Sequence, residues 1–164
     1  MSEMTDEAGK STTRRAALQW AGCAAAAAAS GWVWVTPSAG TPAAMRDAIA
    51  QVTRGAKLNQ GRVQLEIPPL VENGNTVPCT VTVDSPVTGA DHVRAIHVLN
   101  EKNPQPNVFS ARFGPRAGRA SISTRIRLSD TQNVTAIAEL SDGSFWTASV
   151  NVIITLGACL EDLI

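Results

Sequence analysis

The sequence predicts an all-β protein, an immunoglobulin-like antiparallel β-sandwich of about seven strands preceded by a short N-terminal helix. From Gly61 onward, short runs of alternating apolar and polar residues are separated by turn residues roughly every ten positions. The same region is rich in Val, Ile and Thr, which favour pleated strands, and the chain contains no tyrosine. A length of 164 residues is enough for one domain with one core.

A single helix is predicted ahead of the strands. Thr41 is a suitable N-cap, Pro42 fits the first helical position, and Gly55 stands where a helix often ends. Residues 43–54 are good helix formers and place apolar side chains on one face. A helix this short needs a larger body to pack against.

The strand pattern recurs in segments that are separated by Pro, Gly, Asn, Asp and Ser. Between the last two segments, Asp142-Gly143 is flanked by apolar runs and predicts a tight hairpin. The predicted strands are 62–67, 77–84, 92–100, 108–113, 120–128, 133–140 and 144–156.

Residues 1–40 are predicted to be a twin-arginine export signal, and residues 41–164 the mature domain. Arg14 and Arg15 precede an alanine-rich apolar stretch, 20–35, and small residues at 38–40 suit cleavage. The alternative is an N-terminal membrane anchor, since 16–35 is just long enough to span a bilayer. With export and cleavage, Cys23 is lost, and the mature protein works in the periplasm with no membrane attachment.

The formal net charge is zero, which gives no general attraction to nucleic acid or to a membrane surface. One local feature is basic: no acid lies between Glu101 and Asp130. Arg125 and Arg127 alternate with apolar residues and are therefore expected on one face of a strand. This region is either a solvated sheet face or a docking surface for an acidic partner or an anionic adduct. Its basic residues are Lys102, Arg112, Arg116, Arg119, Arg125 and Arg127.

Cys79 is expected to be buried. It alternates with polar residues and shares a face with Val77 and Val81, so its thiol is predicted to pack as a small hydrophobe. The alternative is a disulfide with Cys159, since an oxidising compartment would allow one.

Cys159 stands in a C-terminal tail, residues 157–164, that follows the last predicted strand after Gly157. Chain ends are usually poorly held, so a thiol there can be brought to other molecules. A nucleophilic triad built on Cys159 is a weaker alternative, because a tail is a poor place to hold a nucleophile against its base.

No catalytic or metal constellation is predicted. The two histidines, His92 and His97, are five residues apart and cannot jointly hold a metal through strand geometry. His97 is expected to be a packed or rim side chain and His92 a turn residue. Phosphate-binding glycine loops and paired-cysteine metal spacings do not occur. The chain is therefore predicted to be no enzyme by itself, with no cofactor and no metal.

Four segments of the chain form a recognisable set: IPPLVENGNTVP at 67–78, HVRAIH at 92–97, NPQP at 103–106 and SDGSFW at 141–146. Together they resemble the SoxY family, the sulfur-carrier proteins of periplasmic thiosulfate oxidation. The resemblance implies an immunoglobulin-like sandwich that forms a heterodimer with a second sandwich subunit, SoxZ. It also implies that Cys159 is the substrate attachment point. In that family SoxAX conjugates thiosulfate to the thiol, SoxB removes sulfate, and SoxCD oxidises the remaining sulfur.

The tail departs from the family pattern of two glycines, cysteine and two more glycines. Cys159 is flanked here by Gly157 and Ala158 before it and by Leu160 after it, and two carboxylates follow. Glycines let a backbone bend freely, and Glu161 and Asp162 disfavour a neighbouring thiolate by repulsion. Three hypotheses stay open: a sulfur carrier, a non-catalytic sandwich interaction module, and a periplasmic thiol-disulfide protein. The loop around Pro104 and the hairpin 142–146 are the candidate contacts with a partner subunit.

Overall fold

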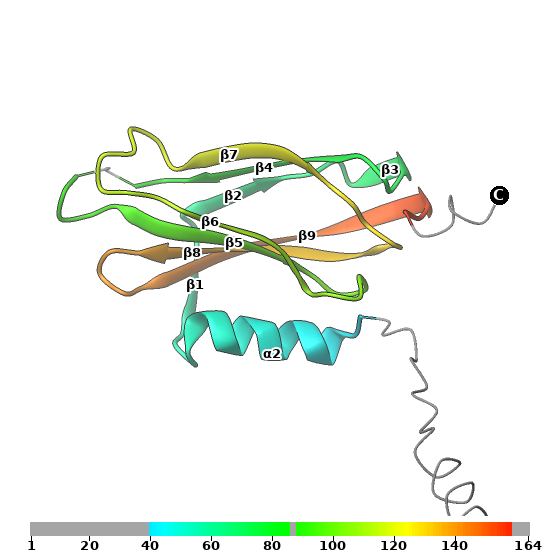
Figure 1. Ribbon diagram of the computed structural model, residues 1–164, viewed down its shortest axis with the longest axis horizontal. Coiled ribbons are helices and arrows are strands. Elements are labelled where there is room, and N and C mark those ends of the chain that lie inside the picture. The colour runs from blue at the N-terminus through cyan, green and yellow to red at the C-terminus, as the bar shows by residue number, and fades with distance from the viewer. Residues whose placement is uncertain (1–39, 86–87, 159–164) are drawn as a thin grey trace, which may run out of the picture. The chain divides into compact units, whose positions relative to one another are not determined.

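The computed structural model describes residues 40–85 and 88–158 (Figure 1). The predicted export signal, with Cys23, lies outside the described residues, apart from Gly40, and stays a prediction. Within the described ranges, no helix is both long enough and apolar enough to cross a membrane.

The predicted helix is present as α2 (Pro42–Thr53). The Thr41 side chain accepts a hydrogen bond from the Ala44 N–H at 3.1 Å, which caps the first turn. Arg54 in the left-handed conformation, with φ of 54°, ends the helix. On the inward face, Met45 packs with Leu99 and with two further buried side chains, Ile137 and Phe145. The helix therefore covers the outer face of one sheet.

The strands form two facing sheets, which confirms the all-β sandwich (Figure 1). The larger sheet has the order β1-β9-β8-β5-β6, with β3 also paired to β9, and the smaller sheet has the order β2-β4-β7. The strands are β1 (Leu58–Gln60), β2 (Val63–Glu66), β3 (Leu70–Asn73), β4 (Val77–Val83), β5 (Val93–Asn100), β6 (Asn107–Arg112), β7 (Ser121–Ile126), β8 (Gln132–Leu140) and β9 (Phe145–Leu156).

Each predicted strand is found within two residues of its expected bounds, and two short strands were not predicted. Both β1 and β3 pair parallel with the same side of β9: Leu58 is opposite Phe145, and Leu70 is opposite Ile153. Between them the chain crosses to the other sheet as β2, which pairs with β4. The sandwich is therefore antiparallel except along this edge.

The core lies between the two sheets and confirms the prediction for Cys79. Along β4 the burial alternates, so Val77, Cys79 and Val81 are almost fully enclosed. Cys79 is a free thiol, and burial raises its pKa to about 11. At pH 8 about one molecule in a thousand then carries the Cys79 thiolate, which makes this thiol a poor nucleophile.

The register places the connections at two opposite ends of the sandwich. The β8–β9 hairpin at one end contains Gly143, whose φ of 81° suits the predicted Asp-Gly turn. We call the other end the tail end. It contains the C-terminal end of β9, the β5–β6 loop, the turn before β4 and the turn after β7. The tail therefore leaves the sandwich where three other connections meet.

Candidate functional site

The first two residues of the tail are held against the sandwich. β9 ends at Leu156, and the Ala158 N–H donates a hydrogen bond to the Leu128 carbonyl at 3.0 Å. A Cβ on Gly157 would overlap the Ser129 carbonyl oxygen, so only glycine fits this close approach. Gly157 and Ala158 are thus fixed to the turn after β7, while Cys159 and Leu160 lie outside the described residues.

Gly74 completes this attachment from the turn before β4. Its N–H donates to the Leu156 carbonyl at 2.8 Å, and its own carbonyl accepts from the Leu128 N–H at 2.8 Å. A Cβ on Gly74 would overlap the Leu128 carbonyl oxygen and lie 3.0 Å from the Ala158 nitrogen. In the sequence, Gly74 is one of the separating residues between two predicted strands, 62–67 and 77–84. Its contact with β9 depends on residues about eighty positions away.

The β5–β6 loop is fixed to the same end by two side-chain amides. Asn103 donates to the Arg127 carbonyl at 2.8 Å and accepts from the Ser129 N–H at 3.0 Å. Gln132 is 1% exposed and accepts from the Lys102 N–H at 2.8 Å. Its Nε2 donates to Asn103 Oδ1 at 3.0 Å. The loop therefore holds the end of β7 in place beside the tail.

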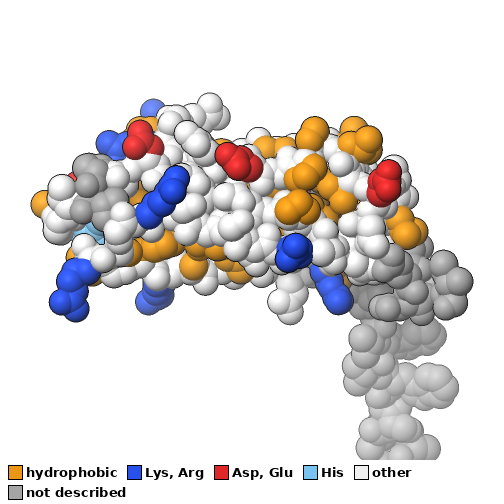
Figure 2. All heavy atoms as spheres, turned by 90° about the horizontal axis from the view of Figure 1, so that it is seen from above, with side chains coloured by type: hydrophobic (Ala, Val, Ile, Leu, Met, Phe, Trp, Pro, Cys, Tyr) orange, Lys and Arg blue, Asp and Glu red, His pale blue; other side chains and the backbone are white. Residues whose placement is uncertain are grey.

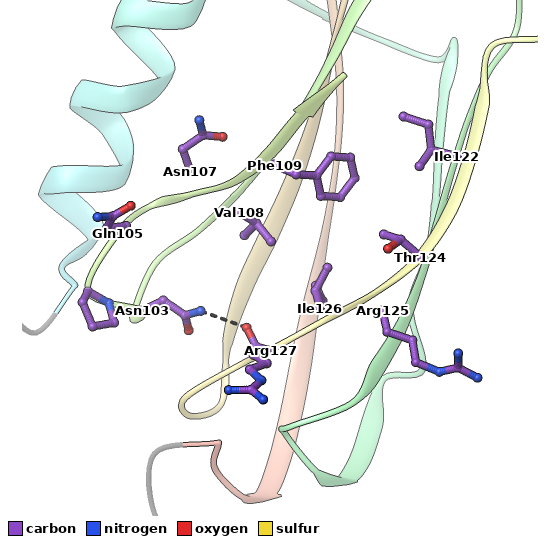
Figure 3. A pocket seen from close by; sticks show the side chains of 11 residues that line it. Asn103, Gln105, Asn107, Val108, Phe109, Ile122, Thr124, Arg125, Ile126 and Arg127 are labelled. Carbon is purple, nitrogen blue, oxygen red and sulfur yellow. Dashed lines mark hydrogen bonds between the residues drawn. The ribbon is translucent and has the colours of Figure 1, made fainter. Parts of the chain in front are cut away.

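A groove opens between β6 and β7, the edge strands of the two sheets (Figure 3). Its volume is about 660 Å³. Val108 and Phe109 face Ile122 and Ile126 across it, and the Asn103 loop forms one end. This groove was not predicted, because no local sequence pattern indicates which strands become sheet edges.

The basic cluster expected from the sequence is divided by the fold. Arg125 on β7 and Arg127 just after it are both exposed and alternate with buried Ile126 and Leu128, as the alternation predicted. Both residues border the groove, and the Arg125 side chain points away from it (Figure 3). Lys102 pairs with Asp130 at 2.6 Å, and this hydrogen bond lowers the pKa of the Asp130 carboxyl below its ordinary value.

The remaining arginines of the cluster lie elsewhere. Arg116 and Arg119 are exposed in the connection before β7. Arg112 lines a separate polar hollow beside the helix, where Arg94 pairs with Glu139 at 3.5 Å. The cluster is therefore not one continuous surface.

The histidines lie at ordinary structural positions. His97 is half-buried, its Nδ1 is 2.8 Å from the Ser110 hydroxyl, and burial lowers its pKa. His92 lies just before β5, as expected of a turn residue. In the part of the chain that the structure describes, no group of three or more His, Cys, Asp or Glu side chains could hold a metal ion.

The hairpin 142–146 lies at the opposite end of β9 from the tail. Ser144 donates to Asp142 Oδ1 at 2.8 Å and lowers the pKa of that carboxyl. The Arg62 guanidinium lies over the Trp146 ring, 5.0 Å from its centre. Of the two predicted partner contacts, only the Pro104 loop is therefore near the tail.

An exposed apolar patch adjoins the tail attachment. Leu70 is 59% exposed and Ile153 is 50% exposed, and the two residues are direct neighbours across the β3–β9 pair. Leu156 is also exposed at the end of β9. Figure 2 shows hydrophobic side chains gathered at this end of the molecule. We call Leu70, Ile153 and Leu156 the β3–β9 patch.

Comparison with solved structures finds similar folds at low identity. A superoxide reductase (neelaredoxin) from Ignicoccus hospitalis aligns with a TM-score of 0.52 and 17% identity, over 57% of this chain and 80% of that one. A putative superoxide reductase from Thermotoga maritima gives 0.52 and 17%, over 59% and 93%. At such identity the likeness concerns the fold alone.

Sequence comparison identifies the family. No curated protein matches the chain. The family model described as sulfur oxidation protein SoxY matches residues 49–159, which include the whole sandwich and the beginning of the tail. The chain therefore belongs to the SoxY family.

Proposed function

We propose that this protein carries sulfur intermediates of thiosulfate oxidation covalently on the Cys159 thiol, in the periplasm, for separate partner enzymes. Membership of the SoxY family makes the chain a carrier protein of sulfur oxidation in general. The observation that carries the finer proposal is that the family match extends through the tail attachment to residue 159. Export by the twin-arginine route is part of the proposal and rests on Arg14 and Arg15.

The chemistry of the proposed site is modest. A Cys159 thiolate forms a disulfide-type bond to the outer sulfur of thiosulfate, and two electrons pass to a SoxAX-like conjugating enzyme. A SoxB-like enzyme then hydrolyses the bond to the sulfonate group and releases sulfate. A SoxCD-like enzyme oxidises the sulfur that remains. The carrier supplies only the thiol and its presentation, so no cofactor or metal is required of it.

The structure supports a fixed point from which the tail extends. Because Gly157 and Ala158 are attached to the β7–β8 turn, the reach starts at residue 159. The six residues 159–164 span about 20 Å when extended, at roughly 3.3 Å each. This span is shorter than the span of residues 157–164, which would apply if the tail were free from the end of β9 onward.

We expect the protein to gain the mass of one thiosulfate group when it is incubated with thiosulfate and a SoxAX-like enzyme. Intact-mass spectrometry and peptide mapping should place the group on Cys159. Cys159→Ser should take up none. Cys79→Ala should take up as much as wild type, because the Cys79 thiol is buried and protonated.

Two outcomes contradict the proposal. An unmodified Cys159 in every preparation would favour an interaction module. A Cys79–Cys159 bridge in a non-reducing peptide map, lost on reduction, would favour a thiol-disulfide protein.

The proposed partner is a SoxZ-like sandwich subunit, and the β3–β9 patch is the surface that we assign to it. Contiguous exposed apolar side chains on a small protein mark interaction sites. We expect Leu70→Asp with Ile153→Asp to separate the heterodimer, measured by size-exclusion chromatography with light scattering of the co-expressed pair. Both side chains are half exposed, so the fold should survive. Gln51→Asp, an exposed helix position, is the control, and a heterodimer that persists in the double variant would remove this patch from the interface.

A further inference from the structure

The polar hollow beside the helix has a floor that the strand register sets. We call it the α2 hollow. On the face of the larger sheet that α2 covers, Ala95 of β5 stands between Arg112 of β6 and Glu139 of β8. Residues directly opposite in neighbouring strands share a face of the sheet, so the small Ala95 side chain leaves a gap between two long ones. His97, two residues along the same face of β5, also lines this gap.

The C-terminal end of α2 forms the remaining wall of the α2 hollow. Gln51, Val52 and Arg54 line it from the helix. The helix is fixed on the sheet because Met45 packs with Leu99 in a buried cluster. The volume of the hollow is about 320 Å³. One water occupies roughly 30 Å³ in the liquid, so the hollow has room for a small anion with several waters.

The α2 hollow carries an excess of positive charge. Three guanidinium groups and one carboxylate line it. Arg94 pairs with the Glu139 carboxylate at 3.5 Å. Among the described residues, no ion pair is found for Arg54 or for Arg112. The C-terminus of α2 adds a partial negative charge of roughly half an elementary charge, which is smaller than the charge of two guanidinium groups. The hollow therefore favours a negatively charged ligand.

His97 adds a hydrogen-bonding group to these charges. Its Nδ1 is 2.8 Å from the Ser110 hydroxyl, and its Nε2 has no hydrogen-bond partner in the part of the chain that the structure describes. Burial lowers the His97 pKa, Arg112 lowers it further, and Glu139 opposes both. The ring is therefore mostly neutral at neutral pH. An anion in the hollow would favour the protonated ring, in which both nitrogens donate.

We propose that the α2 hollow binds a small divalent oxyanion of the sulfate type, held by Arg54 and Arg112 and by a hydrogen bond from His97. Guanidinium groups suit such a ligand because their N–H groups donate to two oxygens at once. Arg94 keeps the carboxylate of Glu139 occupied, which reduces its repulsion of the anion.

The α2 hollow is separate from the tail. Glu139 is opposite Phe145, at the start of β9, whereas the tail leaves from the end of β9. The bound oxyanion is therefore not the group attached to Cys159. Its significance for sulfur oxidation, which consumes thiosulfate and releases sulfate, rests on the proposed carrier function, whereas the binding itself does not.

The test is nuclear magnetic resonance of the reduced, ¹⁵N-labelled protein, titrated with sodium sulfate and with sodium chloride at matched ionic strength. Sulfate forms no covalent bond with a thiol, so the result does not depend on Cys159. The amide signals of residues 51–55, 94–97 and 110–112 should shift with sulfate and saturate. Sodium thiosulfate should saturate the same signals.

Binding should also depend on pH through His97. A bound anion should raise the His97 pKa above its value in the free protein. Binding should therefore tighten as the pH falls from about 8 to about 6, and level off once the ring is protonated in both forms. The imidazole signals of His97 with and without sulfate measure the shift. The charged groups around the ring are Arg94 on β5, Arg112 on β6, Glu139 on β8 and Arg54 at the end of α2.

Three variants locate the site. Arg112→Gln should weaken sulfate binding by about tenfold or more, the cost of one hydrogen bond to a charged group. Arg116→Gln, which removes an exposed arginine outside the hollow, is the matched control and should leave binding unchanged. Glu139→Gln should strengthen binding, because it removes the one carboxylate among the described residues that line the hollow. A damaged fold can weaken binding but cannot strengthen it.

Three results would overturn the proposal. Equal shifts in sulfate and in chloride mean that the arginines respond to screening alone. A dissociation constant that Arg112→Gln does not change means that the anion binds elsewhere, as does a His97 pKa that saturating sulfate does not move. None of these results needs Cys159 or a partner enzyme, so a failure of oxyanion binding is separate from a failure of the carrier function, which is read by mass.

Discussion

Gly157→Val should detach the start of the tail from the sandwich and lower the free energy of unfolding by about 2 kcal/mol. The reason is a contact between backbones. A Cβ at this position overlaps the Ser129 carbonyl oxygen. This oxygen belongs to the backbone, so it cannot rotate away as the end of a flexible side chain can. Relief requires the chain to move outward, which breaks the hydrogen bond from Ala158 to Leu128.

Amide hydrogen exchange and urea unfolding would measure this effect. The Ala158 amide should lose its protection from exchange. The amides of β4 should lose no more protection than the fall in the global free energy of unfolding accounts for. Gly114→Val is the matched control, because a Cβ at Gly114 meets nothing within 4 Å. Retention of Ala158 protection in Gly157→Val would show that the tail is not anchored through this contact.

Leu128→Ala should lower the free energy of unfolding by about 2–5 kcal/mol, the usual range for a fully buried leucine. The Leu128 side chain is completely enclosed in the core between the sheets. Its backbone also joins three segments at the tail end, donating to the Gly74 carbonyl and accepting from Ala158. A cavity here loosens the packing beneath both contacts.

Two controls separate the packing effect from a general effect of truncation on urea unfolding. Leu70→Ala removes the same atoms from a side chain that is 59% exposed, and it should cost much less. Leu128→Met keeps most of the volume and should cost under about 1.5 kcal/mol. Equal losses for Leu128→Ala and Leu70→Ala would contradict the central position of Leu128.

Sequence reasoning found the elements that carry local signals. The helix was predicted because Thr41, Pro42 and Gly55 mark its ends, and the hairpin was predicted because Asp142-Gly143 dictates its turn. Burial of Cys79 followed from alternation alone. In each case the deciding information lies within a few residues of the element.

The features that escaped prediction depend on distant residues. β1 is only Leu58-Asn59-Gln60, and its strand character comes from pairing with Phe145–Thr147. β3 likewise owes its form to the end of β9. The groove exists because β6 and β7 are sheet edges, which the strand order decides. Cys159 and Leu160 were proposed from sequence, lie outside the described residues, and remain predictions.

The placement of β9 has a mechanical consequence. β9 is paired with β8 over residues 145–152 on one side, and with β1 and β3 on the other. A tensile force applied to the tail acts along β9, nearly at right angles to the β8–β9 hydrogen bonds. It therefore loads those bonds in shear and all together, whereas a force across an edge strand would peel them one by one. The body can thus resist traction on its C-terminal end without unravelling.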